Sequence, residues 1–318
     1  MTAVVTDHLP EAARLTLRWD PDRLAAEVRA LSDQPWRNQR AYGSDGPMPE
    51  VTVDWKVLSL RSPGGEPGRT DPGGAGLVGF ADTPLLDRCP AIEEVLRGIP
   101  APLRSVRLMA LGPATRVHTH RDSKCGLPWG RLRLHVPIIT HQRALTVLDG
   151  REWHWEAGQL WYGDFNRLHH VRNEGSTPRI HLVIDTLVTP ALVELFPAEF
   201  RRSLPYADII FAREPVPLQE WELPALCRRF ALPAAFADWA EEDDHAGEPD
   251  VPAEITIAGE RLVLAISSAQ RLALVHLGNA EFRLEGWSDE RSLRLDPDGT
   301  TVLRIRTGRM QWEWQRHA

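Results

Sequence analysis

Two histidines and an aspartate lie close together in the sequence, as His118, His120 and Asp122. Residues two apart on a strand project to the same face, so a histidine and a carboxylate placed like His120 and Asp122 can reach one cation. A second histidine from a later strand would complete the two-histidine, one-carboxylate arrangement that leaves open positions on Fe(II). His169 and His170 are the candidates, and His118 is an alternative ligand. The pattern indicates a metal site, and a surface turn with a local hydrogen bond is the alternative.

Two later segments carry several cations on one strand face. Alternation with apolar residues places Arg131, Arg133 and His135 together on one strand. Three potential cations on one face are too costly for a core unless anions meet them. On a later strand, Arg179 shares a face with Asp185. A guanidinium binds a carboxylate through two parallel hydrogen bonds, so Arg179 suits the distal carboxylate of a dicarboxylic acid such as 2-oxoglutarate, with a structural pair to Asp185 as the alternative.

These residues lie in a region of short, closely spaced β-like runs. Turn signals such as Asp149-Gly150 separate the runs, which favours antiparallel pairing. The predicted strands are 105–110, 116–120, 131–139, 144–148, a stretch around 153, 159–162, 169–173 and 179–187. Eight such strands favour a jelly roll, so we expect a mainly β fold with flanking helices.

The segments before this region contribute further elements. Asp20 can cap a helix that begins at Pro21, and a second short helix is expected over 92–97. Period-two alternation predicts a strand over 51–57. The stretch 62–76 is rich in glycine and proline, which predicts a solvated surface loop, with a lid over the pocket as the alternative.

After residue 188 the pattern changes to helix-like apolar spacing, over 190–200 and 224–239. The acidic, turn-rich stretch 241–249 predicts a linker. Beyond it, alternation predicts strands over 255–266, 271–277 and 292–314. We therefore expect three parts: a jelly-roll domain at 1–188, a helical segment at 189–240 and a small β-rich C-terminal module at 250–318.

Composition limits the classes of function. The 318 residues contain 37 Lys+Arg and 44 Asp+Glu, a formal net charge of −7 that argues against a nucleic-acid partner. No apolar run of about eighteen residues and no signal-peptide pattern is present, so we expect neither a membrane partner nor secretion. Three separated cysteines, Cys89, Cys125 and Cys227, form no disulfide framework and are expected to be buried and inert. A cytoplasmic location fits these features best.

Five motifs follow one another between Ser105 and Asp185. They are His-Arg-Asp at 120–122, Arg-Leu-Arg-Leu-His-Val-Pro at 131–137, Gly-Gln-Leu-Trp-Tyr-Gly-Asp at 158–164, His169 followed by Val-x-Asn, and Pro-Arg-Ile-His-Leu-Val-Ile-Asp at 178–185. This ordered set resembles the aspartyl/asparaginyl β-hydroxylase family of Fe(II)/2-oxoglutarate dioxygenases, which includes bacterial proline cis-hydroxylases.

The resemblance implies a fold, a metal and a cosubstrate. The fold would be a cupin-like double-stranded β-helix. Iron would be held by His120, Asp122 and His169, which are thus the expected catalytic residues. The cosubstrate 2-oxoglutarate would be anchored by Arg179 with help from His135, and O2 would be the oxidant.

The resemblance also bears on the substrate. In family members that act on aspartyl residues, the arginines corresponding to Arg131 and Arg133 face the substrate carboxylate, and Arg121 is a further candidate. A solvated or structural role is the alternative for such strand arginines. The animal peptide-modifying members have glycine at the position of Asp122, whereas this chain keeps the aspartate, as the bacterial amino-acid hydroxylases do.

Three functions therefore compete. The first is hydroxylation of an Asp- or Asn-type side chain, most plausibly in a peptide gripped by the C-terminal module, with release of succinate and CO2. The second is the same chemistry on a free amino acid such as L-proline, with the module serving only dimerisation or lid support. The third is a non-catalytic jelly-roll binding protein. The expected partner is thus an amino acid or a peptide, and a homodimer is an open alternative.

Overall fold

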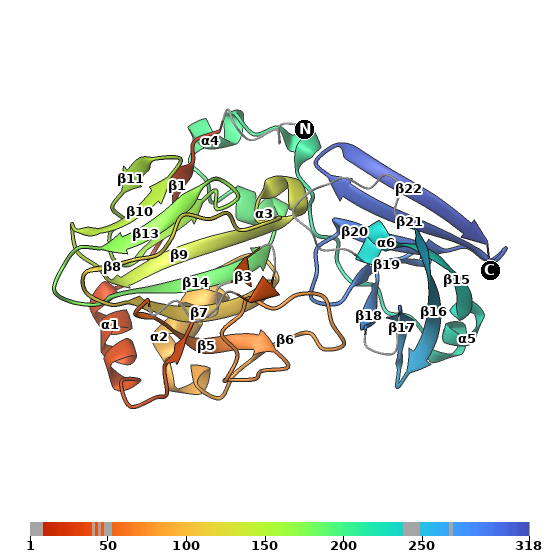
Figure 1. The fold of residues 1–318 in the computed structure, drawn as a ribbon, viewed down its shortest axis with the longest axis horizontal. Helices are drawn as coiled ribbons and strands as arrows, with labels where there is room; N and C mark the ends of the chain where they lie inside the picture. Colours follow the sequence, from red (N-terminus) through yellow and green to blue (C-terminus); the bar gives the residue numbers. More distant parts are fainter. Residues whose placement is uncertain are drawn as a thin grey trace. The chain divides into compact units, whose positions relative to one another are not determined.

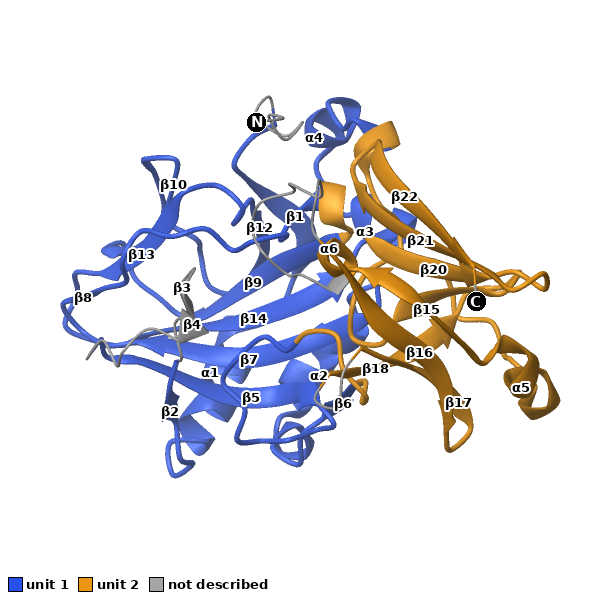
Figure 2. Ribbon diagram, turned by 45° about the vertical axis from the view of Figure 1, so that its right-hand side comes forward, with its two compact units in different colours: residues 1–73, 80–127, 131–206 blue, residues 74–79, 128–130, 207–318 orange. Residues whose placement is uncertain are grey.

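The computed structural model describes residues 9–39, 42–43, 46–47, 53–237, 249–266 and 270–317. Two compact units divide the chain, as Figure 2 shows. Unit 1 comprises residues 1–73, 80–127 and 131–206, and unit 2 comprises residues 74–79, 128–130 and 207–318. Two short segments, 74–79 and 128–130, therefore belong to unit 2 although the chain before and after each of them belongs to unit 1.

Two antiparallel sheets form most of unit 1. The larger sheet has the strand order β1 (Ala12–Arg18), β12 (Gln159–Gly163), β9 (Arg131–Ile139), β14 (Arg179–Leu187), β7 (Leu103–Leu111), β5 (Trp55–Pro63) and β2 (Arg37–Asn38), with β6 (Phe80–Asp82) also paired to β5. The smaller sheet has the order β11 (Arg151–Trp153), β10 (Ala144–Leu148), β13 (His169–Asn173) and β8 (Thr115–Arg116). A separate short pair joins β3 (Tyr42–Gly43) to β4 (Gly46–Pro47).

The two sheets pack around a shared interior. Ala12 on the larger sheet and Leu148 on the smaller one belong to the same buried cluster, together with Trp155 and Phe165. Packing of two antiparallel sheets through their inner faces is the architecture of a jelly roll. The expected fold class is thereby confirmed, as are the strands from 131 to 187. The expected strand at 116–120 is shorter than predicted, because only Thr115–Arg116 has regular pairing.

Two helices cover the outer face of the larger sheet, as Figure 1 shows. The helix α1 (Pro21–Ala30) begins where predicted, and the Asp20 carboxylate accepts the backbone N–H of Asp22 at 2.9 Å. The helix α2 (Pro90–Arg97) is capped by a side chain of its neighbour, since the Glu27 carboxylate accepts the N–H groups of residues 91 and 92. The helix α1 packs against β9. Because side chains alternate along a strand, the polar face of β9 then lies toward the interior.

The segment 62–76 is held at several points. The Ser62 hydroxyl donates a hydrogen bond to the carbonyl of Glu66 at 2.7 Å. The carbonyl of Thr70 accepts a hydrogen bond from the buried guanidinium of Arg107 at 3.2 Å. At its far end, Gly76 exchanges backbone hydrogen bonds within unit 2. Residues 51–52 of the expected strand at 51–57 lie outside the described residues, and the observed strand begins at Trp55.

The expected helices after residue 188 are shorter than predicted, and one expectation is wrong. Pro197 ends the first run, which splits into α3 (Pro190–Val193) and α4 (Ala198–Arg202). The predicted helix at 224–239 contains a strand, β15 (Arg228–Pro233), because Phe230 and Leu232 alternate into a sheet core. Short helices flank it, α5 (Leu223–Leu226) and α6 (Ala234–Ala237), and 3-10 turns occur at Leu86–Arg88, Leu127–Trp129, Tyr206–Asp208 and Glu220–Glu222. Most of the expected acidic linker, residues 241–248, lies outside the described residues.

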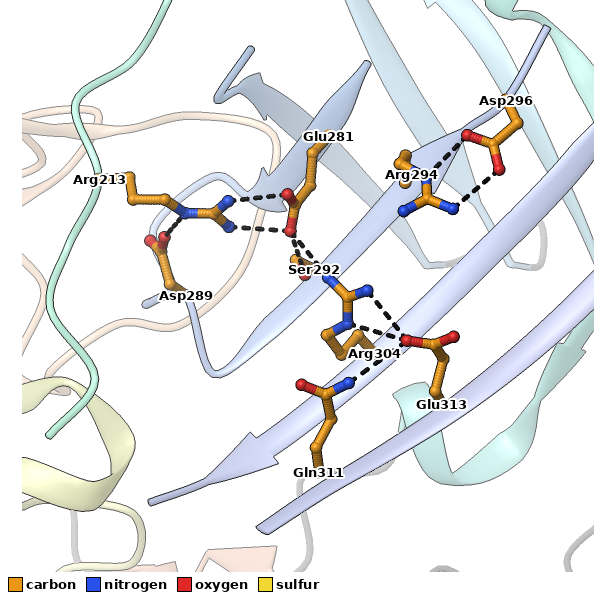
Figure 3. Close-up of polar contacts among 9 residues, drawn as sticks. All are labelled: Arg213, Glu281, Asp289, Ser292, Arg294, Asp296, Arg304, Gln311 and Glu313. Atoms are coloured by element: carbon orange, nitrogen blue, oxygen red, sulfur yellow. Dashed lines mark hydrogen bonds and ion pairs between the residues drawn. The ribbon is translucent and has the colours of Figure 1, made fainter. Parts of the chain in front are cut away.

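Unit 2 is built on an antiparallel sheet in which each strand pairs with the next. After β15 come β16 (Asp250–Ala258), β17 (Arg261–Ala265), β18 (Arg271–His276), β19 (Glu281–Leu284), β20 (Arg291–Leu295), β21 (Thr300–Thr307) and β22 (Met310–His317). One face carries an apolar core that includes Leu264, Phe282 and Leu303. Glu281 on β19 forms ion pairs with Arg213, which precedes β15, and with Arg304 on β21, as Figure 3 shows. The predicted β structure at 255–266, 271–277 and 292–314 is confirmed, although the first run contains parts of two strands and the last contains parts of three, and β19 was not predicted.

No helix among the described residues is long and apolar enough to cross a membrane.

Candidate active site

Backbone pairing brings the three predicted metal ligands together. His120 and His169 each donate a backbone N–H to the other's carbonyl at 2.9 Å, although only His169 lies on a regular strand. The N–H of Asp122 is held by the carbonyl of Phe165 at 2.8 Å. The ligand atoms of the three side chains all lie within 4.8 Å of one another. Distances from the histidine Nε2 atoms to the Asp122 carboxylate are 3.8 Å for His120 and 3.9 Å for His169.

The hydrogen bonds of the two imidazoles show that this cluster fits a metal ion. The Nδ1 atom of His120 lies 2.9 Å from the carbonyl of His118, and that of His169 lies 2.9 Å from the carbonyl of Arg167. A carbonyl only accepts, so both Nδ1 atoms carry a proton, and the neutral form of each ring presents its Nε2 lone pair. Burial lowers the pKa of His169 to about 4, which keeps this imidazole neutral as a ligand requires. Two imidazoles and one carboxylate form the donor set that suits Fe(II).

The other two histidines considered for this site lie outside the cluster. The His170 ring points to Thr119, with 3.5 Å between Nδ1 and the hydroxyl. The His118 ring is exposed and its centroid lies 5.1 Å from that of His120. Among the described residues, only His120, Asp122 and His169 form such a group.

Arg179 is a buried cation that reaches across from one sheet to the other. Its side chain, on β14, donates from Nη2 to the Thr146 hydroxyl on β10 at 3.4 Å and to Nδ1 of His181 at 2.9 Å. The residue is only 3% exposed, and burial lowers the pKa of its guanidinium to about 9. No carboxylate among the described residues pairs with it, because Asp185 pairs with other arginines. A buried cation with neutral partners is suited to an anionic ligand.

The contact with Arg179 fixes the tautomers of two histidines. Arginine only donates, so Nδ1 of His181 is unprotonated. His135 must then donate its own Nδ1–H across the 3.2 Å that separates its Nδ1 from that of His181. Burial lowers the pKa of both imidazoles well below the usual range, so both are neutral. The Nε2 atom of His135 is buried without a partner among the described residues, which leaves one polar atom open to a ligand.

The aromatic ring of Phe165 connects this pocket to the metal cluster. The ring stacks on His135 with centroids 4.9 Å apart and meets His169 edge-on at 5.0 Å. Trp155 also packs on His135, with centroids 5.3 Å apart, and meets Phe165 edge-on at 6.3 Å. A series of ring contacts therefore links His135, beside Arg179, to the metal-ligating His169.

The three arginines predicted to bind substrate have different surroundings. Arg131 donates to the backbone carbonyls of residues 123 and 124, whereas Arg133 contacts the carboxylates of Asp122 and Asp185. Arg121 is exposed, and its Nη1 lies 3.5 Å from the carbonyl of Asn166.

Sequence reasoning missed Arg107 and Thr146. Arg107 on β7 pairs with Asp185 at 3.0 Å. The strand was predicted, but no polar role was assigned to Arg107. An arginine flanked by apolar residues on a predicted strand was the available signal. The role of Thr146 depends on the facing of two sheets, which no local pattern reveals. The expectation that all three cysteines are buried holds for Cys89; Cys125 is only partly buried, and Cys227, where α5 ends, is exposed.

Comparison with known proteins places the chain. The family model for aspartyl/asparaginyl β-hydroxylase matches residues 18–188. Among solved structures, a Pseudomonas putida prolyl-4-hydroxylase is 14% identical, with a TM-score of 0.35 over 57% of this chain and 94% of that one. A viral collagen prolyl hydroxylase from Paramecium Bursaria Chlorella virus-1 is 11% identical, with a TM-score of 0.35 over 57% and 99%. An oxidoreductase of the 2OG-Fe(II) oxygenase family from Burkholderia pseudomallei is 14% identical, with a TM-score of 0.32 over 51% and 77%.

The family match spans more than half of the 318 residues and contains every residue of the site described above. The chain therefore belongs to the aspartyl/asparaginyl β-hydroxylase family and is a 2-oxoglutarate-dependent hydroxylase that uses Fe(II), 2-oxoglutarate and O2.

Proposed function

We propose that this enzyme hydroxylates the side chain of an aspartyl or asparaginyl residue within a peptide, with release of succinate and CO2. The observation that carries the proposal is the buried guanidinium of Arg179, which has no carboxylate partner among the described residues and is linked to the metal-ligating His169 through His181, His135 and Phe165. A dicarboxylate bound there neutralises a cation that is otherwise costly to bury.

His120, Asp122 and His169 would hold the iron, each through the atom that its hydrogen bonds leave free. When bound, Fe(II) supplies the activation of O2 that couples decarboxylation of 2-oxoglutarate to hydroxylation of a C–H bond. The chain holds both imidazoles in one tautomer, and the buried rings of Phe165 and Trp155 keep water from this side of the site.

The distal carboxylate of 2-oxoglutarate would be bound by Arg179. Two N–H groups of a guanidinium can meet two carboxylate oxygens at once. Thr146 and His181 keep the guanidinium in place before the ligand arrives, so little side-chain entropy remains to be lost. The Nε2 of His135 has no partner among the described residues, and it would help to bind the cosubstrate in the tautomer that carries the proton on Nε2, since the oxygens of 2-oxoglutarate only accept.

The carboxylate of the substrate would be met by arginines near Asp122. Arg121 is exposed beside the cluster, so it is accessible to a peptide. Arg133 is already paired with Asp122 and Asp185, so it would have to exchange one of these contacts for the substrate carboxylate. Arg131, on the same strand face as Arg133, would contribute positive charge. Positive charge on this side of the site favours an acidic or amide-bearing residue over an apolar one.

The test is a turnover assay with purified enzyme, iron, ascorbate and 2-oxoglutarate. Peptides containing Asp or Asn are compared with free L-proline and other free amino acids, and each product is examined by mass spectrometry for one added oxygen. We expect oxygen on the peptide and a matching amount of succinate. Oxygen only on a free amino acid would refute the peptide substrate.

Two variants test the assigned residues. Asp122→Ala should abolish succinate release, while Asp82→Ala, which removes an exposed carboxylate of the same unit, should leave it unchanged. Full turnover in Asp122→Ala would remove Asp122 from the metal site.

A further inference from the structure

Arg133 lies between two carboxylates. On one side it makes a paired contact with Asp185, from Nε to Oδ1 at 2.7 Å and from Nη2 to Oδ2 at 3.2 Å. On the other side its Nη1 contacts Oδ2 of Asp122. Asp185 and Arg133 are directly opposite each other on β14 and β9, so the sheet register fixes the first contact. Asp185 thus holds the guanidinium in an orientation in which its Nη1 contacts the Asp122 carboxylate.

A second arginine extends this network away from the metal cluster. Arg107, on β7, donates from Nη2 to Oδ2 of Asp185 at 3.0 Å and from Nη1 to the carbonyl of Thr70 at 3.2 Å. The side chains of Arg107 and Asp185 are 2% and 8% exposed, and that of Arg133 is 16% exposed. Two guanidinium groups and two carboxylates therefore alternate along this mostly buried network, and the buried Arg104 adds a further positive charge near Asp185.

The charge balance affects how strongly Asp122 can bind a cation. A guanidinium against a carboxylate withdraws electron density from it and repels any metal ion that approaches the same oxygens. Asp185 offsets both effects, because it neutralises Arg133 from the opposite side and fixes its direction. In a buried site the effective dielectric constant is low, so a change of one unit charge has a large effect on the neighbouring carboxylate.

We propose that Asp185 is a positioning residue for the metal: by neutralising and orienting Arg133, it sets the affinity of the site for a divalent cation. The inference deepens the proposed function and rests on the role of Asp122 as a metal ligand. Arg107 should lower this affinity. Its positive charge offsets part of the negative charge of Asp185, so Asp185 neutralises Arg133 less completely.

Two variants separate this role from simple structural support. Asp185→Asn and Arg107→Gln break the same buried ion pair, but they change the charge of the network in opposite directions. A structural role predicts that both weaken metal binding. Our proposal predicts that Asp185→Asn weakens it by roughly 10- to 100-fold and that Arg107→Gln tightens it.

The measurement is the dissociation constant of Mn²⁺ by calorimetry, without 2-oxoglutarate or substrate, on full-length protein whose folding is checked by circular dichroism. Asp208→Asn is the matched control, because it removes a buried carboxylate that pairs with Arg309 in unit 2. It should leave the dissociation constant unchanged.

Each result decides the matter. Unchanged binding in Asp185→Asn, or unchanged or weaker binding in Arg107→Gln, overturns the inference. Should Asp185→Asn fail to fold, the sign of the change in Arg107→Gln decides alone. Mn²⁺ binding that survives in Asp122→Ala would refute the metal site itself, whereas its loss there with normal binding in Asp185→Asn would refute only the positioning role.

Discussion

At the scale of single residues, Arg179 combines a cost for folding with a use in binding. The guanidinium is buried, and the partners described for it, Thr146 and His181, are neutral. A buried charge without a counter-charge destabilises the folded state, and an apolar side chain of similar volume does not. The residue thus lowers the stability of the free enzyme and gives the site its attraction for a dicarboxylate.

Arg179→Met should therefore raise the free energy of unfolding of the ligand-free protein, by about 1 kcal/mol or more. The same variant should lose the increase in melting temperature that 2-oxoglutarate gives the wild-type enzyme. Arg167→Met is the contrasting control, because Arg167 pairs with the buried carboxylate of Asp164 at 3.1 Å and the variant removes this counter-charge. A loss of stability in Arg179→Met as large as that in Arg167→Met would make Arg179 a structural residue.

The buried pair His135 and His181 predicts a pH dependence of stability. Burial lowers the pKa of both imidazoles well below their usual range. Below about pH 6.5, unfolded histidine binds a proton that the folded protein does not, so stability falls as the pH falls. Each such histidine contributes a slope of up to about 1.4 kcal/mol per pH unit, and this loss is absent above pH 6.5.

His181→Asn should therefore flatten the dependence of the free energy of unfolding on pH between 6.5 and 5, by up to about 1.4 kcal/mol per unit. Urea denaturation at several pH values, with a chelator present, gives the two slopes. The asparagine oxygen can still accept the hydrogen bond from Arg179. Parallel slopes for wild type and variant would contradict the neutral, buried state of this imidazole.

At the scale of elements, alternation within a strand was predictable and pairing between strands was not. The sequence placed Arg133 and His135 on one face of β9, because a period of two residues is a local property. It did not place Arg107 beside Asp185, since that contact depends on β7 lying next to β14. The strand β15 was missed for a similar reason: only its ladder with β16 distinguishes it from a helix of the same composition.

The entry to β12 gives a prediction at this scale. Gly158 has a φ of +75°, and a Cβ there would lie 2.3 Å from the carbonyl oxygen of Trp19. Gly158→Ala should destabilise the protein by about 2 kcal/mol or more, from the left-handed backbone and the collision together. Gly150→Ala is the matched control, with a φ of +80° but open space around its Cβ, and it should cost about 1 kcal/mol. Equal losses in urea denaturation would show that the contact with Trp19 has no effect.

At the scale of the whole molecule, every candidate site residue belongs to unit 1, and unit 2 has a separate core. This division was only partly visible in the sequence. Local patterns predicted β strands after residue 250, but not that residues 74–79 and 128–130 join them. Segments of three to six residues carry too little periodicity to reveal which sheet they extend.

The division into units predicts where ligands stabilise the molecule. A ligand that binds only the folded state slows the opening of the structure that forms its site. Hydrogen exchange followed by mass spectrometry should therefore show slower exchange in β9, β13 and β14 when Mn²⁺ and 2-oxoglutarate are added under nitrogen. Exchange in β17 to β22 should stay as in the free protein, and Asp122→Ala should show no slowing in either unit. Slower exchange throughout unit 2 would mean that its strands open together with the site, and would contradict a role for unit 1 alone in binding metal and cosubstrate.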